Sequence, residues 1–578
     1  MKRLATPDLA APAIRLAEDQ RARSARCTRK ALRKVQRGLR TRCSGAPTIA
    51  ILRMAVAALL PAGAFAAPPA AAATAPESRP ERFVEAVRAF ADVALKYGRD
   101  TYGPKHTPLF VDGIHADTHQ PVMWKARDGR AWALSDLGNQ QNFFRTLAGL
   151  SALTGDPQYK QAAVDATRYA LTNLMEGGFL AWGGHMAYDA SDDIVVCAEN
   201  KGRVHELKSH YPFYELMWEI DPGATRSLIE NMWNGHVLDW SNLDFNRHGH
   251  PQKMGRLWKS EYKGTPVFFD GGGLTFINAG SDLVYAAAQL SRFSGESEPL
   301  VWAKRLARRY VETRDPKTGI GGYQFSQDRS AWCDDVGKIR GDRAAYFFAA
   351  DFLGHHVVEG TLFPAYGNTP VVRPRICQLL LGEALGTNGA EFVQWAREDL
   401  AAWGKAAYRA ADNAFIPMLT DGTSLEGYVV KKDGYFGPKG RVLTAGKAGA
   451  IDFWTYALGY RLTDDAFLGQ MTRSIRNANA FEKGADPSAL FGFLELFRKT
   501  GDRAELQAAE RVGDNILAAG RYRTGWVKFD RVEPLALLHL AAALQDRAGL
   551  VPAYNGGAGF FSADYADQGN KYDDSLYR

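Results

Sequence analysis

Hydrophobic residues recur three and four positions apart in long stretches of the chain, which is the spacing of one face of an α-helix. In four segments, one such stretch ends at a short polar break and a second stretch follows at once. These segments start at Leu150, Leu290, Leu458 and Leu496. The pattern predicts pairs of antiparallel helices, each pair joined by a tight turn.

The predicted turns share a sequence. Three of them read Thr or Ser, then Gly, then Asp or Glu, and we expect their glycines to end the first helix in a left-handed conformation; they are Gly155, Gly295 and Gly501. In the first turn, Asp156 is expected to cap the second helix and Pro157 to occupy its first position. The polar breaks therefore predict where each hairpin bends.

Helix hairpins of this kind can stack into an open solenoid or close into a toroid of inner and outer helices. The hairpins here have no fixed period, which disfavours a solenoid. Segments rich in glycine and aromatic residues, such as GTPVFFDGGG and TGIGGYQF, separate them and fit loops over one end of a barrel. We predict an all-α protein, an α/α toroid whose long loops form the active-site mouth, with an open solenoid as the alternative.

The first 66 residues differ from the rest of the chain. They contain 14 Lys or Arg against 3 Asp or Glu, and they lead into the apolar run MAVAALLPAGAFAA with a small-residue cleavage pattern at Ala64-Phe65-Ala66. We interpret residues 1–66 as a leader and signal peptide, with Met54 as an alternative start after residues 1–53, and residues 67–578 as one catalytic domain. The run is short for a membrane span, although an uncleaved anchor is the alternative. The protein is expected to be exported, to the periplasm or the medium.

Charge and cysteine content exclude some classes of function. The formal charge is +7 for the whole chain but −4 without residues 1–66, so the basicity belongs to the leader and no nucleic-acid partner is expected. No stable membrane partner is expected either. Beyond the leader, the cysteines are few and widely spaced, which fits buried side chains better than a zinc ribbon or a disulfide framework; they are Cys197, Cys333 and Cys377.

Histidines mark one quarter of the chain as chemically distinct. Nine of the twelve fall between residues 106 and 250, where about 3 would fall by chance. Imidazole serves both as a metal ligand and as a base near neutral pH. The sequence HELKSH is not the zinc-protease helix, because His205 and His210 are five residues apart and would diverge by about 140° on a helix. Glu206 is expected on a short helix that ends near Pro212.

An ordered series of sequence blocks is more specific than any single motif. The blocks are WGGH, HELKSHYPFYELMWE, WNGHVLDWSNLDFNRHG, GIGGYQFSQ and GDRAAYFF. Over roughly residues 95–440 they resemble the pectate lyases of polysaccharide lyase family 2, in particular exopolygalacturonate lyases. The resemblance implies an α/α barrel of about seven helix pairs that cleaves 1,4-linked uronans by β-elimination and releases 4,5-unsaturated uronates.

The same resemblance implies a catalytic site. It places a metal on His185, Glu206 and His248, and it makes Arg247 the catalytic base. Two imidazoles and a carboxylate suit a divalent ion, manganese first, with nickel, cobalt or zinc as alternatives. Such an ion would act as a Lewis acid on the uronate carboxylate. Because the pKa of arginine is far above neutral, an alkaline pH optimum is expected.

Further residues are expected to bind the acidic polysaccharide or oligosaccharide substrate. Trp182 lies beside a Gly-Gly pair and fits a wall on which a sugar ring stacks, and Lys208 and Arg343 are candidates for the substrate carboxylates. The structural alternative for Arg247 is an ion pair with Asp239 or Asp244. The other histidines of this region are expected to be hydrogen-bonded core or helix-end residues; those considered are His205, His210, His236 and His250.

Four alternatives to a pectate lyase remain at this point. A non-catalytic binding protein would keep the aromatic residues but would have no use for Arg247. A glycoside hydrolase on a toroid would need a carboxylate pair and would keep its activity in chelator. A sugar epimerase of similar architecture would use histidines without a metal. A lyase acting on a different uronan would use the same site with different subsites.

Overall fold

A computed structural model describes residues 80–125, 131–181, 186–197, 204–273, 275–328, 355–356, 358, 369–431, 438–520 and 526–557. All of them belong to the unit Glu77–Arg578, which is compact in itself. The predicted leader and signal peptide lie outside the described residues. Among the described residues, no helix is both long enough and apolar enough to cross a bilayer.

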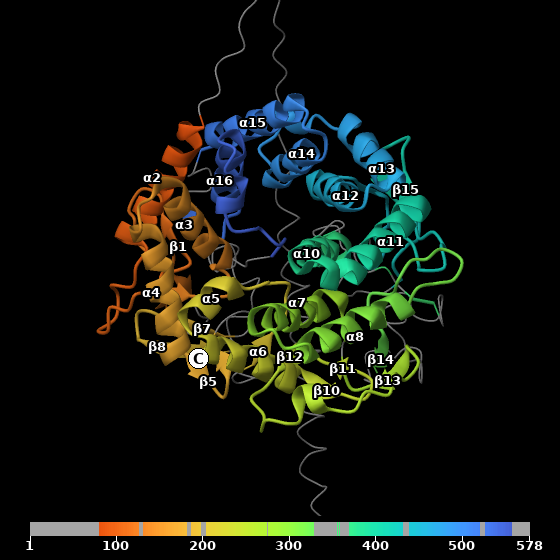
Figure 1. Cartoon of the computed structure of the whole chain (residues 1–578), viewed down its shortest axis with the longest axis horizontal. Helices are drawn as coiled ribbons and strands as arrows, with labels where there is room; N and C mark the ends of the chain where they lie inside the picture. The colour runs from red at the N-terminus through yellow and green to blue at the C-terminus, as the bar shows by residue number, and fades with distance from the viewer. Residues whose placement is uncertain are drawn as a thin grey trace, which may run out of the picture. The chain divides into compact units, whose positions relative to one another are not determined.

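The described helices form seven antiparallel pairs arranged in a ring (Figure 1). The pairs are α3 (Gln141–Thr154) with α4 (Gln158–Asn173), α5 (Tyr214–Ile220) with α6 (Pro222–His236), α7 (Ile277–Ser294) with α8 (Glu298–Glu312), α10 (Thr369–Leu385) with α11 (Ala390–Ala407), α12 (Ala450–Thr463) with α13 (Ala466–Asn477), α14 (Pro487–Thr500) with α15 (Arg503–Ala518), and α16 (Glu533–Leu544) with α2 (Glu81–Tyr97). The last helix, α16, packs on both α2 and α3 and closes the ring. The α/α toroid is therefore confirmed, and the open solenoid is excluded.

The pattern of apolar residues separates inner from outer helices. The inner helix α16 has the sequence EPLALLHLAAAL and buries every residue from Pro534 to Ala543, because other helices surround it. The outer helix α13 buries one face, at Leu468, Met471 and Ile475, and leaves the other face to water. The core accordingly lies between the two layers and around the inner helices.

The tight turns follow the sequence prediction closely. Gly155, Gly295 and Gly501 end α3, α7 and α14 with φ of 77°, 77° and 71°, which is the left-handed conformation. The carboxylate of Asp156 accepts the backbone N–H of Gln158, the first residue of α4, at 3.1 Å, although Pro157 is the residue at the N-cap. Pro157 directly precedes the helix instead of occupying its first position.

The two ends of the ring differ in the length of their connections. Six of the described inner helices join their outer partners through a turn of at most four residues, as between Thr154 and Gln158; the exception is α16, whose partner α2 is the first described helix. Each outer helix joins the next inner helix through a longer segment at the opposite end; these segments are residues 98–140, 174–213, 237–276, 313–368, 408–449, 478–486 and 519–532. The four described site residues fall within two of these connections, so the fold collects them at one end of the ring; they are Glu206, Lys208, Arg247 and His248.

Small sheets lie in the long connections, and short 3₁₀ turns occur there and elsewhere. The sheets are β1 (Gly113–His115) with β18 (Trp526–Lys528), β2 (Trp124–Lys125) with β3 (Ala131–Trp132), β4 (Leu134–Ser135) with β7 (Met186–Asp189) and β8 (Ile194–Cys197), β5 (Met175–Glu176) with β6 (Phe179–Leu180), β9 (His205–Glu206) with β12 (His248–Gly249), β10 (Val237–Asp239) with β11 (Asp244–Phe245), β13 (Phe269–Gly271) with β14 (Ser326–Asp328), and β15 (Tyr408–Arg409) with β16 (Ala414–Phe415) and β17 (Gly446–Lys447). The 3₁₀ turns are η1 (Leu257–Lys259), η5 (Gly386–Gly389), η6 (Phe481–Lys483) and η7 (Ala548–Leu550). Only β13 and β14 pair in parallel among the described strands.

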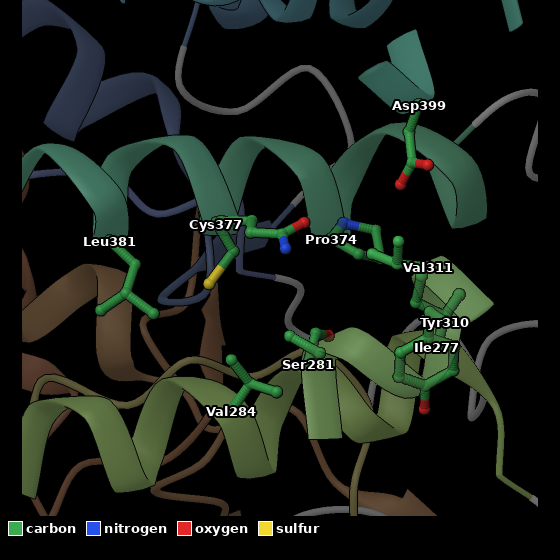
Figure 2. Close-up of a pocket in the computed structure, with 11 residues that line it drawn as sticks. Ile277, Ser281, Val284, Tyr310, Val311, Pro374, Cys377, Leu381 and Asp399 are labelled. Atoms are coloured by element: carbon green, nitrogen blue, oxygen red, sulfur yellow. The ribbon is translucent and has the colours of Figure 1, made fainter. Parts of the chain in front are cut away.

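A pocket lies in the wall of the ring between α7 and α10 (Figure 2). Its lining is largely apolar, with Val284 and Leu381 at one end and Asp399 at the other. Cys377 also lines it and is buried, as the sequence predicted for this cysteine. Burial raises the pKa of its thiol well above the ordinary value, so this cysteine stays protonated and is not a nucleophile.

Candidate active site

Glu206 lies on a strand, so the prediction that it lies on a short helix is wrong. Residues 205 and 206 form β9, and the next helix, α5, begins only at Tyr214. Between them, Ser209 and Tyr211 have φ of 58° and 43°, which a right-handed helix cannot contain. The backbone here pairs with β12 from the next long connection, a contact that the local sequence does not record.

The register of β9 and β12 brings two predicted metal ligands together. Glu206 pairs directly with His248, and His205 pairs with Gly249. Side chains of directly paired residues lie on the same face of a sheet, so Glu206 and His248 share one face, and His205 and Gly249 share the other. The Nε2 atom of His248 is 3.5 Å from Oε1 of Glu206.

Glu206 is the centre of a cluster of positive charge. Its side chain is 1% exposed, and Lys208 Nζ lies 2.8 Å from Oε2 while Arg247 Nη2 lies 3.5 Å from Oε1. Four of the predicted site residues, from two separate connections, therefore meet here: Glu206, Lys208, Arg247 and His248. The side chains of Arg247 and His248 remain 32% and 21% exposed, so the cluster borders the surface.

The structural alternative for Arg247, an ion pair with Asp239 or Asp244, is not what the structure shows. Asp244 accepts hydrogen bonds from the backbone N–H groups of Gly272 and Gly273, at 2.7 Å and 3.1 Å. Asp239 accepts one from the N–H of Ser241 at 2.8 Å. Among the described residues, the ion pair of Arg247 is with Glu206.

Three predicted site residues lie outside the described residues: Trp182, His185 and Arg343.

Trp233 is fully buried against Trp240, and its indole N–H donates to the carbonyl of Leu283 at 3.0 Å. Trp233 is therefore a core residue and offers no face for a sugar ring.

Glu206 and His248 are spaced as two ligands of one divalent ion would be. A separation of 3.5 Å between His248 Nε2 and Glu206 Oε1 subtends about 110° at an ion bonded to both atoms at about 2.1 Å, an ordinary coordination angle. A third ligand would have to come from elsewhere, since the described residues contain no group of three or more His, Cys, Asp or Glu side chains that could hold an ion.

Two buried histidines lie on the other face of the β9–β12 pair. His205 Nδ1 is 2.8 Å from His236 Nε2, and His236 Nδ1 is 2.7 Å from the carbonyl oxygen of Asn246. Burial lowers the pKa of His205 well below the ordinary value and that of His236 to about 4, so both rings are neutral at physiological pH. The prediction that they are hydrogen-bonded core residues is confirmed.

The loop that carries Lys208 is held by residues that the sequence prediction missed. Both carboxylate oxygens of Asp282, on α7, accept backbone N–H groups of this loop, from Ser209 at 2.6 Å and Tyr211 at 3.2 Å. Arg145, on α3, is 1% exposed and donates to the carbonyl of Tyr211 at 2.8 Å. Arg145 is the one charged residue of the apolar helix α3, and that isolation was the available signal for it, because a buried charge needs a specific partner.

Comparison with known proteins assigns the chain to a family. Residues 107–564 match the model of a family described as periplasmic pectate lyase. The chain belongs to the periplasmic pectate lyase family. A relative from Dickeya dadantii (strain 3937), a pectate disaccharide-lyase, is 30% identical over 515 residues, which cover 85% of this chain and 94% of the relative. The resemblance drawn from the sequence blocks is confirmed.

Solved structures with related architecture are more distant. A D-mannose isomerase is 13% identical, with a TM-score of 0.39, over 70% of this chain and 88% of its own. A family 76 glycoside hydrolase (mannosidase) from Bacteroides thetaiotaomicron is 10% identical, with a TM-score of 0.36, over 81% of this chain and all of its own.

Membership of the pectate lyase family decides the class of chemistry. The protein is a polysaccharide lyase that acts on uronans, and its substrate is an acidic polysaccharide. The periplasmic location of the family agrees with the predicted export. The glycoside hydrolase and epimerase alternatives are therefore set aside.

Proposed function

We propose that this lyase cleaves 1,4-linked galacturonan by β-elimination, with Arg247 as the base that removes the C5 proton. The observation that carries the proposal is the pairing of β9 with β12, which brings Arg247 and His248 from one connection against Glu206 from another. The pairing leaves the Arg247 side chain partly exposed at the border of this cluster, where a polysaccharide can reach it.

The elimination requires one proton transfer and one bond cleavage. The C5–H bond breaks and its proton passes to the neutral guanidine of Arg247, while its electron pair forms the C4–C5 double bond. The C4–O bond breaks, and the leaving oxygen takes a proton from water. The product carries a 4,5-unsaturated uronate at its new non-reducing end.

Using arginine as a base has a free-energy cost that sets the pH dependence. At about pH 8.5, removing a proton from a group whose pKa is about 12.5 costs about 5.5 kcal/mol. The proposal therefore predicts a rate that rises toward alkaline pH.

A divalent metal belongs to the proposed site, with Glu206, His248 and His185 as its ligands and manganese as the first candidate. When bound, it would supply Lewis-acid stabilisation of the negative charge that develops on the uronate carboxylate. Lys208, whose side chain is 17% exposed beside Glu206, is proposed to bind a carboxylate of the substrate. Trp182 and Arg343 are proposed to line neighbouring subsites.

The name of the Dickeya relative suggests the product. A pectate disaccharide-lyase releases disaccharides, and we propose that this chain does the same. The products of a short digestion of polygalacturonate, separated by size, check this point. An unsaturated disaccharide that dominates from the start supports exo action, whereas a ladder of longer products contradicts it.

The ultraviolet absorbance of unsaturated uronates tests the proposed mechanism. Polygalacturonate is incubated with the purified protein at alkaline pH, with and without chelator, and Mn²⁺ is then restored. Absorbance that rises, stops in chelator and returns with Mn²⁺ supports metal-dependent elimination. Absorbance that continues unchanged in chelator contradicts the metal, and a flat trace on every uronan contradicts the proposed reaction.

Arg247→Lys tests the base directly. Loss of a general base is expected to lower kcat by about 10²–10⁴-fold with little change in KM. Arg409→Lys is the matched control, because Arg409 also lies in a long connection, on β15, and forms exposed ion pairs with Asp412 and Glu426. Equal effects of the two substitutions would contradict the role of Arg247.

A further inference from the structure

We propose that His236 is a positioning residue of this lyase, which fixes the backbone of Asn246 and thereby orients Arg247 and His248. The inference rests on the proposed roles of those two residues. His236 is the last residue of α6, is completely buried, and lies on the face of the β9–β12 pair opposite to Glu206.

Both backbone groups of Asn246, its N–H and its carbonyl, are hydrogen-bonded to His236. The N–H of Asn246 donates to the carbonyl of His236 at 3.0 Å, and the carbonyl of Asn246 lies 2.7 Å from His236 Nδ1. The side chain of Asn246 continues the arrangement, because its Oδ1 accepts the N–H of His248 at 3.0 Å. The backbone on either side of Arg247 is therefore tied to the end of α6.

The hydrogen bonds fix the tautomer of each ring. A carbonyl oxygen only accepts, so Nδ1 of His236 carries the proton. A charged imidazole is costly in a buried site, so Nε2 of His236 is unprotonated and accepts from Nδ1–H of His205. The result is a directional chain from His205 through His236 to the carbonyl of Asn246.

The ring of His236 also sets the position of the strand. A Cβ atom on Gly249 would lie 2.5 Å from Cδ2 and Nε2 of His236, so the ring packs directly against the backbone of β12. Gly249 pairs with His205, whose ring is hydrogen-bonded to Nε2 of His236. His236 thus packs against one face of the β9–β12 pair, and the side chains of Glu206 and His248 lie on the other face.

Two amide substitutions separate the two hydrogen bonds of the ring. In His236→Asn, the amide nitrogen replaces Nδ1 and keeps the donor to Asn246. In His236→Gln, the amide replaces Nε2 and loses that donor while it keeps a polar group toward His205. Positioning through Asn246 predicts that kcat falls about 10–100-fold in His236→Gln, with KM little changed, and only a few-fold in His236→Asn.

His539→Asn is the matched control for loss of a buried histidine. His539, on α16, is 7% exposed and bonds through Nε2 to the carbonyl of Pro552 at 3.0 Å, so Asn removes an equivalent donor far from the site in sequence. Urea unfolding gives the free energy of unfolding of each variant, so that changes in kcat can be compared at equal loss of stability. If His236→Gln and His539→Asn lower kcat equally at equal loss of stability, or if both His236 variants are equally active, the positioning role is overturned.

Two readouts without turnover complete the test. Mn²⁺ binding to His236→Gln is expected to be about 10–100-fold weaker than to the parent, because His248 is displaced. In protein labelled with ¹⁵N-histidine, free of metal and substrate, His236 is expected to show the Nδ1–H tautomer, and an Nε2–H tautomer overturns the inference. A parent protein without lyase activity would instead refute the proposed function, and the tautomer would still decide whether the hydrogen-bond chain exists.

Discussion

Replacing Gly249 by alanine tests how closely the site depends on the spacing between β12 and the ring of His236. An added Cβ would lie 2.5 Å from two atoms of the His236 ring, where an ordinary contact begins at 3.4 Å. The ring cannot turn away without breaking its hydrogen bonds to His205 and Asn246. The strand that carries His248 must therefore move by about 0.9 Å.

A displacement of this size is expected to affect catalysis more than stability. Misplacing a catalytic group by about 1 Å can cost about 10²-fold in rate, whereas overpacking a core costs about 1–3 kcal/mol. Gly249→Ala is thus expected to lower kcat/KM on polygalacturonate by about 10–100-fold while the protein stays folded. Initial rates from ultraviolet absorbance and urea unfolding curves give the two quantities.

Gly446→Ala is the matched control. Gly446 also lies on a two-residue antiparallel strand, β17, in another long connection, but a Cβ there meets no atom within 4 Å. It is expected to leave both rate and stability nearly unchanged. If Gly249→Ala had the same kcat/KM as this control, the spacing between β12 and His236 would not govern the site, and the reasoning would be refuted.

Three further outcomes follow from single residues. Lys208→Gln is expected to raise KM for polygalacturonate about tenfold, or about 1.4 kcal/mol, and a purely structural Lys208 would leave KM unchanged. Burial raises the pKa of Asp282 to about 7, so its protonated form stabilises the fold at low pH and this contribution is lost as pH rises toward 7. The stability advantage of the parent over Asp282→Asn in urea unfolding should therefore shrink between pH 5 and pH 8, and an advantage that grows would contradict the sign. Burial lowers the pKa of His539 to about 3. The contribution of this neutral histidine to the free energy of unfolding is therefore lost as pH falls below about 6.5. Between pH 7 and pH 5, His539→Gln should lose about 2 kcal/mol less stability than the parent. Equal losses would show that His539 does not titrate on unfolding.

The sequence by itself determined the helices and their turns. The spacing of apolar residues is a local property, and a left-handed glycine is required wherever a helix ends in a tight turn, so Gly155, Gly295 and Gly501 could be assigned without a structure. The ordered blocks likewise identified the family, because each block keeps its residues in a fixed local order. Both kinds of information are contained in short stretches of chain.

Only the tertiary structure decided how the site is built. Glu206 is on a strand because its backbone pairs with a segment from the next connection, and helical spacing in HELKSH carries no record of that partner. The roles of Asp282 and His236 depend on backbone groups of residues 209–211 and 246, which any side chain would supply equally. Contacts to backbone atoms from distant segments leave almost no trace in a single sequence, so the residues that hold this site could be found only once the ring had brought them together.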